Sequence, residues 1–94
     1  MTETVRIGCG AGYAGDRWEP ALELAEKGDI DFLAFECLAE RTIALASLAM
    51  HHDASAGFNP RLGERMTAVL PACVARGITI VSNMGAANPL GAAR

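Results

Sequence analysis

Apolar residues along this chain come in short blocks, and three of these blocks have the character of strands. Residues 5–9, 30–37 and 78–82 combine consecutive apolar positions with β-branched or aromatic side chains. The second block is nearly continuous after Asp31, which is typical of a parallel strand that is covered on both faces. The hydrophobic pattern therefore predicts three strands.

Helices are predicted over residues 18–27, 39–52 and 61–76. Pro20 fits the first turn of the first helix, and Gly28 and Gly77 are placed to end the first and the third. The middle helix is apolar around most of its circumference, which predicts burial on more than one face. Pro71 is expected to bend the third helix. That helix carries an apolar stripe with helical spacing: Leu62, Met66, Val69, Leu70, Cys73 and Val74.

The order of elements is β-α-β-α-α-β, and residues 86–94 open a further helix. Strands that alternate with helices predict an α/β fold with a parallel sheet and right-handed crossovers. Three helices would cover the two faces of such a sheet only thinly. We therefore expect residues 1–94 to be the N-terminal fragment of a single larger α/β domain, open or barrel-like, with the remainder of a longer polypeptide as its partner. Exposed sheet edges and apolar helix surface also make a homo-oligomer possible.

The composition of the chain limits the classes of protein to which it can belong. The chain has 94 residues, 51% of them hydrophobic, which suits one small globular domain and excludes a disordered tail. Its longest apolar block, residues 43–50, is far shorter than the roughly 20 residues of a membrane span. A net charge of −3 argues against nucleic acid as a partner. Three cysteines without CxxC spacing and no visible signal peptide lead us to expect a cytoplasmic protein.

Polar residues concentrate where the predicted strands end. Ligands of parallel α/β folds bind at the carboxyl ends of the strands, where residues 9–17, 36–41 and 83–88 are expected to meet. A small-molecule substrate is a possible ligand there. These segments hold Asp16, Arg17, Glu36, Glu40, Arg41, Asn83 and Asn88.

The first of these segments contains a glycine pattern, Gly10-x-Gly12-x-x-Gly15, which matches a dinucleotide-binding motif. In that motif the helix begins near the second glycine, whereas Pro20 delays the helix here to about Trp18. The glycines therefore have two further interpretations: a flap over another ligand, or a loop that needs positive φ or close backbone approach.

Glu36 also has two interpretations. With Glu40 it could act as a general base or metal ligand, or it could accept amide hydrogen bonds while Glu40 occupies the first turn of a helix. Cys9 could be a nucleophile, although an unreactive cysteine is the commoner case, and Cys73 is predicted to lie in the core. His51 and His52 are adjacent on a helix and cannot chelate together, so we predict no metal site.

The three strand-end segments together resemble one family. Gly8 to Arg17 (GCGAGYAGDR), Asp31 to Thr42 (DFLAFECLAERT) and Asn83 to Pro89 (NMGAANP) are similar to the opening of the acyclic terpene utilisation (AtuA-like) proteins. Members of that family are several times longer, which implies that this chain is the first part of their N-terminal domain. The resemblance implies a link to the catabolism of acyclic terpenoids such as citronellol and geraniol, or of branched acyl-CoA compounds.

Our first hypothesis is a component of an enzyme of unknown reaction and cofactor, with Arg17 binding an anionic group and Glu36 transferring protons. Non-catalytic binding or scaffolding in the same pathway is the alternative, and a dinucleotide-binding unit is the weaker third. The predicted catalytic residues are Glu36, Asp16 and Arg17, and the predicted substrate-binding residues are Gly10, Gly12, Gly15, Asn83, Gly85 and Asn88.

Overall fold

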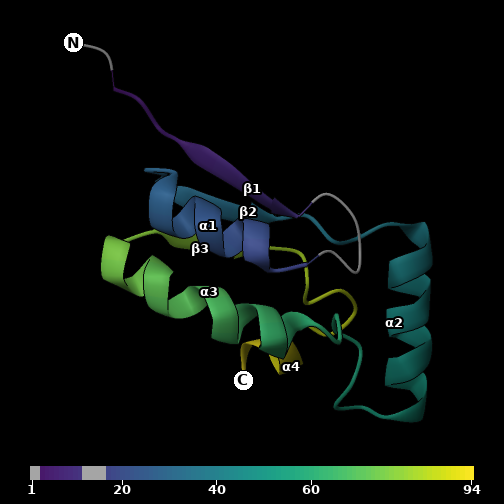
Figure 1. The fold of residues 1–94 in the computed structure, drawn as a ribbon. Helices are drawn as coiled ribbons and strands as arrows, with labels where there is room; N and C mark the ends of the chain where they lie inside the picture. Colours follow the sequence, from purple (N-terminus) through teal and green to yellow (C-terminus); the bar gives the residue numbers. More distant parts are fainter. Residues whose placement is uncertain (1–2, 12–16) are drawn as a thin grey trace.

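A computed structural model of the chain describes residues 3–11 and 17–94, and it has the predicted order of elements. Figure 1 shows the strands side by side with helices α1 and α3 lying along them. The elements are β1 (Ile7–Ala11), α1 (Glu19–Lys27), β2 (Phe32–Phe35), α2 (Glu40–His52), α3 (Leu62–Arg76), β3 (Thr79–Ser82) and α4 (Pro89–Ala93).

The described residues form a three-stranded sheet in the order β1-β2-β3, and both pairings are parallel. The predicted α/β class and parallel sheet are therefore confirmed. Leu33 of β2 lies between Gly8 of β1 and Ile80 of β3, which fixes the register. The register of β1 shifts between Cys9 and Ala11, a local irregularity at Gly10.

Helices α1 and α3 pack together on one face of the sheet and form the core with it. Leu33 and Phe35 point from β2 into this layer and are fully buried. They meet Ala21 and Ala25 of α1, together with Val69, which belongs to α3. The small residues of α1 let that helix approach the strands closely, so the core is one layer of helices against one face.

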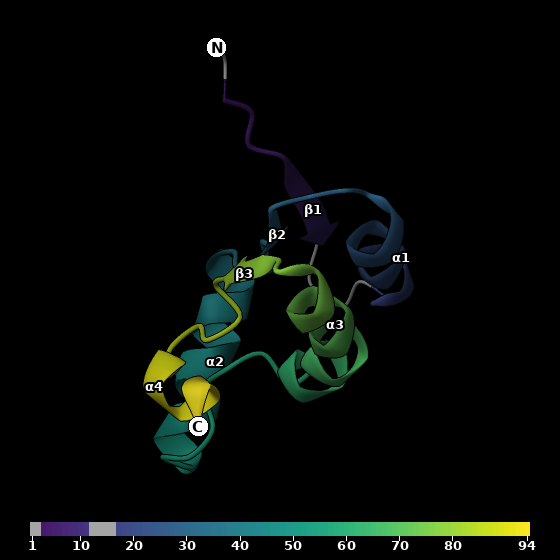
Figure 2. The ribbon, with the colours of Figure 1, turned by 90° about the vertical axis from the view of Figure 1, so that its left-hand side faces the viewer.

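The opposite face of the sheet is not covered by any described element. Ile7 of β1 and Val81 of β3 point to that side, with 68% and 56% of their surface exposed. Helix α2 does not cover this face either: it stands across the end at which the strands finish, as Figures 1 and 2 show. All of α2 is described and it has no buried residue, so the described residues do not provide the burial on more than one face that its composition predicted.

The ends of several elements differ from the prediction. The first strand covers Ile7–Ala11 instead of residues 5–9, so it runs through Gly10, which was expected to follow the strand. The second strand is shorter than predicted and ends at Phe35, because the Cys37 amide donates to the side chain of Asn83 instead of continuing the ladder. Pro20 in the first turn of α1 and Gly77 with φ of 69° at the end of α3 agree with the prediction.

Helix α3 continues through Pro71 and buries only part of its predicted stripe. Val69 and Cys73 lie in the core, as expected for Cys73, and burial raises the pKa of the Cys73 thiol. Leu70 and Val74 were expected on the same face, but they are 47% and 73% exposed. None of the described helices is long and apolar enough to cross a membrane.

Candidate functional site

Two of the predicted site residues, Glu36 and Asn83, come together where β2 and β3 end. The Asn83 amide donates from Nδ2 to Glu36 Oε1 at 2.9 Å, and its Oδ1 accepts the Cys37 amide at 2.8 Å. Glu36 Oε1 also accepts the amide of Leu38 at 3.0 Å. Asn83 therefore ties together two segments that are 46 residues apart in sequence.

The environment of Glu36 keeps its carboxyl group ionised. The hydrogen bonds from Asn83 and then from the Leu38 amide lower the pKa of Glu36 below its ordinary value, and the side chain is exposed. Of its two interpretations, amide acceptance is the one for which contacts are present. The accepted amide lies in the connection before α2, and Glu40 occupies the first turn of that helix as predicted.

The other predicted site residues lie elsewhere. Gly10 lies within β1, where a Cβ would come within 2.6 Å of the Phe35 ring, and a Cβ on Gly85 would come within 2.7 Å of Pro89. Arg17 is exposed and makes no hydrogen bond to Glu36 or Asn83. Three further predicted residues, Gly12, Gly15 and Asp16, lie outside the described residues.

Asn88 makes hydrogen bonds to two separate segments of the chain. Its Oδ1 accepts the Gly91 amide at the start of α4, and its Nδ2 donates to the carbonyl oxygens of Ala54 and Ala56. The backbone amide of Asn88 also donates to the Gly57 carbonyl at 3.1 Å. These bonds fasten the loop after α2 to the segment after β3.

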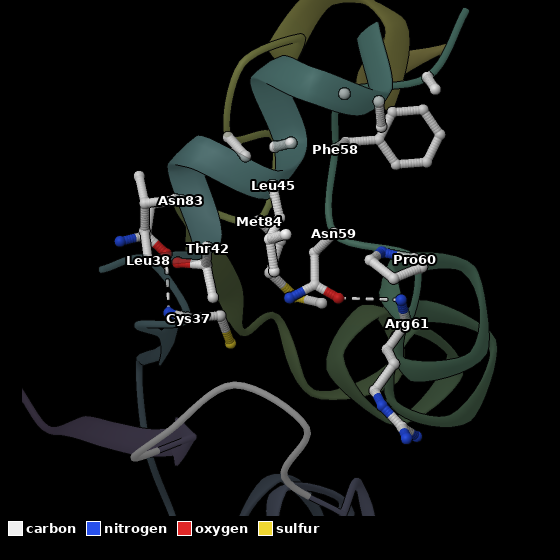
Figure 3. A pocket seen from close by; sticks show the side chains of 15 residues that line it. Cys37, Leu38, Thr42, Leu45, Phe58, Asn59, Pro60, Arg61, Asn83 and Met84 are labelled. Carbon is white, nitrogen blue, oxygen red and sulfur yellow. Dashed lines mark hydrogen bonds between the residues drawn. The ribbon is translucent and has the colours of Figure 1, made fainter. Parts of the chain in front are cut away.

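A cavity of about 410 Å³ lies beneath α2 at this edge of the sheet (Figure 3). Helix α2 contributes one face, whose residues recur at spacings of three and four. The loop before α3 and the segments that follow β2 and β3 form the other walls. The lining residues are Cys37, Leu38, Thr42, Leu45, Ala46, Ala49, Ala56, Gly57, Phe58, Asn59, Pro60, Arg61, Asn83, Met84 and Ala86.

The sequence supports this arrangement of the loop locally. Gly57 has φ of 106°, a conformation that suits glycine, and a Cβ there would lie 2.9 Å from the side chain of Met50. Asp53 Oδ1 accepts bonds from the amide and the hydroxyl of Ser55, and both lower the pKa of the Asp53 carboxyl. The chain thus reverses tightly after α2, and the apolar face of that helix lines the cavity together with the segment that follows β3.

Most of the polar side chains around the cavity bond to the protein. The Thr42 hydroxyl accepts the Ala39 amide at 2.6 Å and donates to the Ala39 carbonyl, while both amide atoms of Asn83 are engaged as described above. Figure 3 shows the guanidinium of Arg61 directed away from the other lining side chains. The cavity therefore presents a mainly apolar surface.

A buried arginine underlies the cavity and was not singled out from the sequence. Arg65 of α3 is only 2% exposed, and its Nη1 lies 3.0 Å from Cys37 Sγ and 3.9 Å from Met84 Sδ. Its guanidinium also lies 5.3 Å from the centre of the Phe35 ring, a cation–π contact. The spacing of Arg65 could have indicated its burial from the sequence. Arg65 precedes Val69 by four positions and therefore lies on the same face of α3 as the buried residues.

Cys9 and the paired histidines are exposed. Cys9 is exposed, and its Sγ donates to the Ala11 carbonyl at 2.9 Å. His51 and His52 are exposed at the end of α2. No group of three or more metal-binding side chains forms within residues 3–11 and 17–94.

Comparison with known families adds to this geometry. The model of the family described as "Acyclic terpene utilisation family protein AtuA" matches residues 5–94, nearly the whole chain. The chain belongs to this AtuA family. The family resemblance predicted from the sequence is thereby confirmed. In this AtuA chain, two of the segments that carried the resemblance, residues 31–42 and 83–89, contribute side chains to the wall of the cavity. No curated protein and no solved structure matches the chain.

Proposed function

We propose that this chain binds an acyclic terpenoid, or a related branched acyl compound, in the cavity beneath α2. The observation that carries the proposal is the cavity itself, about 410 Å³ in volume and lined mainly by apolar side chains at the carboxyl edge of the parallel sheet. Membership of the acyclic terpene utilisation family supports this class of ligand.

The size and lining suit an apolar chain better than a polar metabolite. Sites for small molecules commonly have volumes of roughly 300–1,000 Å³ and few polar groups. Leu38, Leu45, Phe58 and Met84 offer both aliphatic and aromatic surface, which a methyl-branched hydrocarbon can cover. Burial of such a chain would remove apolar surface from water on both sides, which is the main driving force for this kind of binding.

Binding is more directly supported than catalysis. Glu36 does not line the cavity, and it connects to the cavity wall through Asn83. Its lowered pKa makes it a weak proton acceptor, because a general base works best with a pKa near the operating pH. The catalytic roles of Glu36, Asp16 and Arg17 stay predictions, and catalysis on the bound compound is the second candidate function.

Dinucleotide binding has less support. Gly10 lies inside a strand, and α1 begins at Glu19, four positions after Gly15. The motif needs its glycines at the turn where the helix begins, because amides of the first helical turn bind the pyrophosphate. This spacing does not favour that interaction.

The test uses the methionines as reporters. Met84 lines the cavity and Met66 does not, so citronellol added to chain labelled with ¹³C at its methionine methyl groups should shift the Met84 signal and leave Met66 unchanged. The variant Leu45→Trp should fill the cavity and weaken binding at least tenfold. Leu48→Trp is the matched control, because Leu48 is similarly exposed on the same helix and lies outside the lining.

Two results would count against the proposal. One is a titration in which citronellol, and a branched acyl compound tested beside it, leave the Met84 methyl signal in place at millimolar concentration. The other is equal weakening by Leu45→Trp and Leu48→Trp, which would show that the substitutions act on the helix in general and not on the cavity.

A further inference from the structure

Asn59 is held by three hydrogen bonds at the wall of the cavity. Its backbone amide donates to the Met84 carbonyl at 2.7 Å, and its own carbonyl accepts the Leu62 amide at 3.1 Å. Its side-chain Oδ1 accepts the Arg61 amide at 2.9 Å. The residue is therefore fixed to the segment after β3 on one side and to the start of α3 on the other.

These bonds decide which way the side-chain amide faces. Oδ1 must point to the Arg61 amide, since turning the group over would place the Nδ2 donor against another N–H donor. Nδ2 consequently lies on the other side of the group, beside Met84 and among the lining side chains, as Figure 3 shows. Nδ2 has no hydrogen-bond partner among the described residues, and Asn59 is half-buried.

We infer that Asn59 is a specificity-determining residue, whose Nδ2 donates a hydrogen bond to an oxygen atom of the bound molecule. The inference rests on the function proposed above and adds the chemistry of the ligand's polar end: a hydroxyl, aldehyde or other carbonyl oxygen that can accept. Thr42 and Asn83 each already donate to an oxygen of the protein, whereas the Asn59 nitrogen has no acceptor within the part of the chain that the structure describes.

A donor in an apolar wall discriminates between ligands of equal shape. A hydrocarbon that fills the cavity would cover Nδ2 without giving it an acceptor, and the loss of its contact with water would then weaken binding. An aldehyde or alcohol with the same skeleton would supply that acceptor. From the usual net contribution of one hydrogen bond we expect these two ligands to bind about 2- to 13-fold more tightly than the hydrocarbon.

The test measures three matched ligands on the same chain: citronellol, the aldehyde of the same carbon skeleton, and the corresponding hydrocarbon. The variant Asn59→Asp keeps an oxygen for the Arg61 amide and replaces the donor with an acceptor. The preference for the aldehyde over the hydrocarbon should then disappear. Citronellol, which can donate to the carboxylate, should bind more tightly than the aldehyde in this variant.

The ratio of the affinities for the aldehyde and the hydrocarbon serves as the internal control. A substitution that weakens the binding of every ligand equally leaves this ratio unchanged. Unchanged preference for the aldehyde in Asn59→Asp would overturn the inference, and so would equal binding of all three ligands to the natural chain. In the latter case the apolar cavity would still bind, so the proposed function would survive. If none of the three moves the Met84 signal, the proposed function fails and the inference fails with it.

A second variant guards against loss of folding in Asn59→Asp. Asn59→Ser also keeps an oxygen for the turn before α3, in a shorter side chain that moves the donor away from the ligand. It should reduce the aldehyde preference without introducing a charge. A preference that persists in Asn59→Ser would also overturn the inference.

Discussion

At the scale of single residues, the site depends on polar side chains that make hydrogen bonds within the protein. Asn83 employs both amide atoms to join Glu36 to the amide of Cys37, and Asn88 employs both to join α4 to the loop after α2. These two residues were predicted to bind substrate; the contacts that they make are bonds within the protein, and the substrate-binding role stays a prediction. Asn59 differs from them because its side-chain nitrogen donates no hydrogen bond to any described residue.

The bond between Glu36 and Asn83 predicts a local response to acid. The pKa of Glu36 is lowered by its donors from an ordinary value of 4.5, so the contribution of this contact to stability is complete above about that pH. It should be lost as the pH falls through the lower pKa of the folded state. The measurement is an NMR titration that follows the side-chain amide of Asn83 and the backbone amide of Leu38.

The variant Glu36→Gln supplies the control for that titration. Glutamine keeps an oxygen that can accept from both donors but cannot titrate, so the acid transition at Asn83 and Leu38 should vanish. The Ser55 amide, bonded to Asp53, should keep its own acid transition in this variant, since the pKa of Asp53 is lowered independently. An acid transition at Asn83 that survives Glu36→Gln would contradict the assignment.

At the scale of elements, close approach between a strand and its neighbours depends on glycine. Gly8 and Gly10 alternate on β1 and both face the helical layer, where Leu24 and Phe35 occupy the space that side chains would take. Gly63 of α3 is the opposite case, because a Cβ there would meet nothing within 4 Å. The same residue type therefore has different consequences in the two elements.

This contrast predicts opposite effects of one substitution. Gly10→Ala should destabilise the chain by about 1–3 kcal/mol, because its Cβ would press on the Phe35 ring, which is 1% exposed and has little room to move. Gly63→Ala, the matched control, should be neutral or stabilise by about 0.5 kcal/mol, because alanine favours helix and restricts the unfolded chain. Urea denaturation of both variants provides the comparison. Equal effects at the two positions would show that packing against Phe35 is unimportant.

At the scale of the whole molecule, the described residues place helices on one face of the sheet only. Parallel sheets in folded proteins are normally covered on both faces, and here Ile7 and Val81 remain exposed on the open side. Figure 2 shows α1 and α3 together on one side of the strands. Within the residues that the structure describes, an open apolar face and the unpaired edges of β1 and β3 favour association with further protein surface.

We expect the isolated chain to self-associate through this open face, in line with the homo-oligomer anticipated from the sequence. Val81→Lys should lower the average mass measured by sedimentation at a given concentration, because a charge on the open face opposes its burial. Val74→Lys is the control, since Val74 is even more exposed but lies on α3, outside the sheet. A mass unaffected by Val81→Lys, or lowered equally by both variants, would contradict this prediction.

The sequence by itself determined the order of the elements, the parallel sheet and the family. Those features follow from local chemistry: runs of apolar residues, Pro20 and Gly77 at helix ends, and three strand-end segments in a fixed order. It also brought Glu36 and Asn83 to the same edge of the sheet, because parallel strands end on one side.

Only the tertiary structure decided where α2 stands, that a cavity lies beneath it, and which polar atoms face that cavity. The apolar breadth of α2 predicted burial on more than one face, but spacing along a helix does not specify which partner its faces meet. The bond from the Asn59 backbone amide to Met84 fixes Asn59 at the cavity wall, and Arg65 is buried against Met84 and Cys37, which lie 19 and 28 positions from it. Such contacts form only when distant segments fold against one another, so no local pattern of residues encodes them.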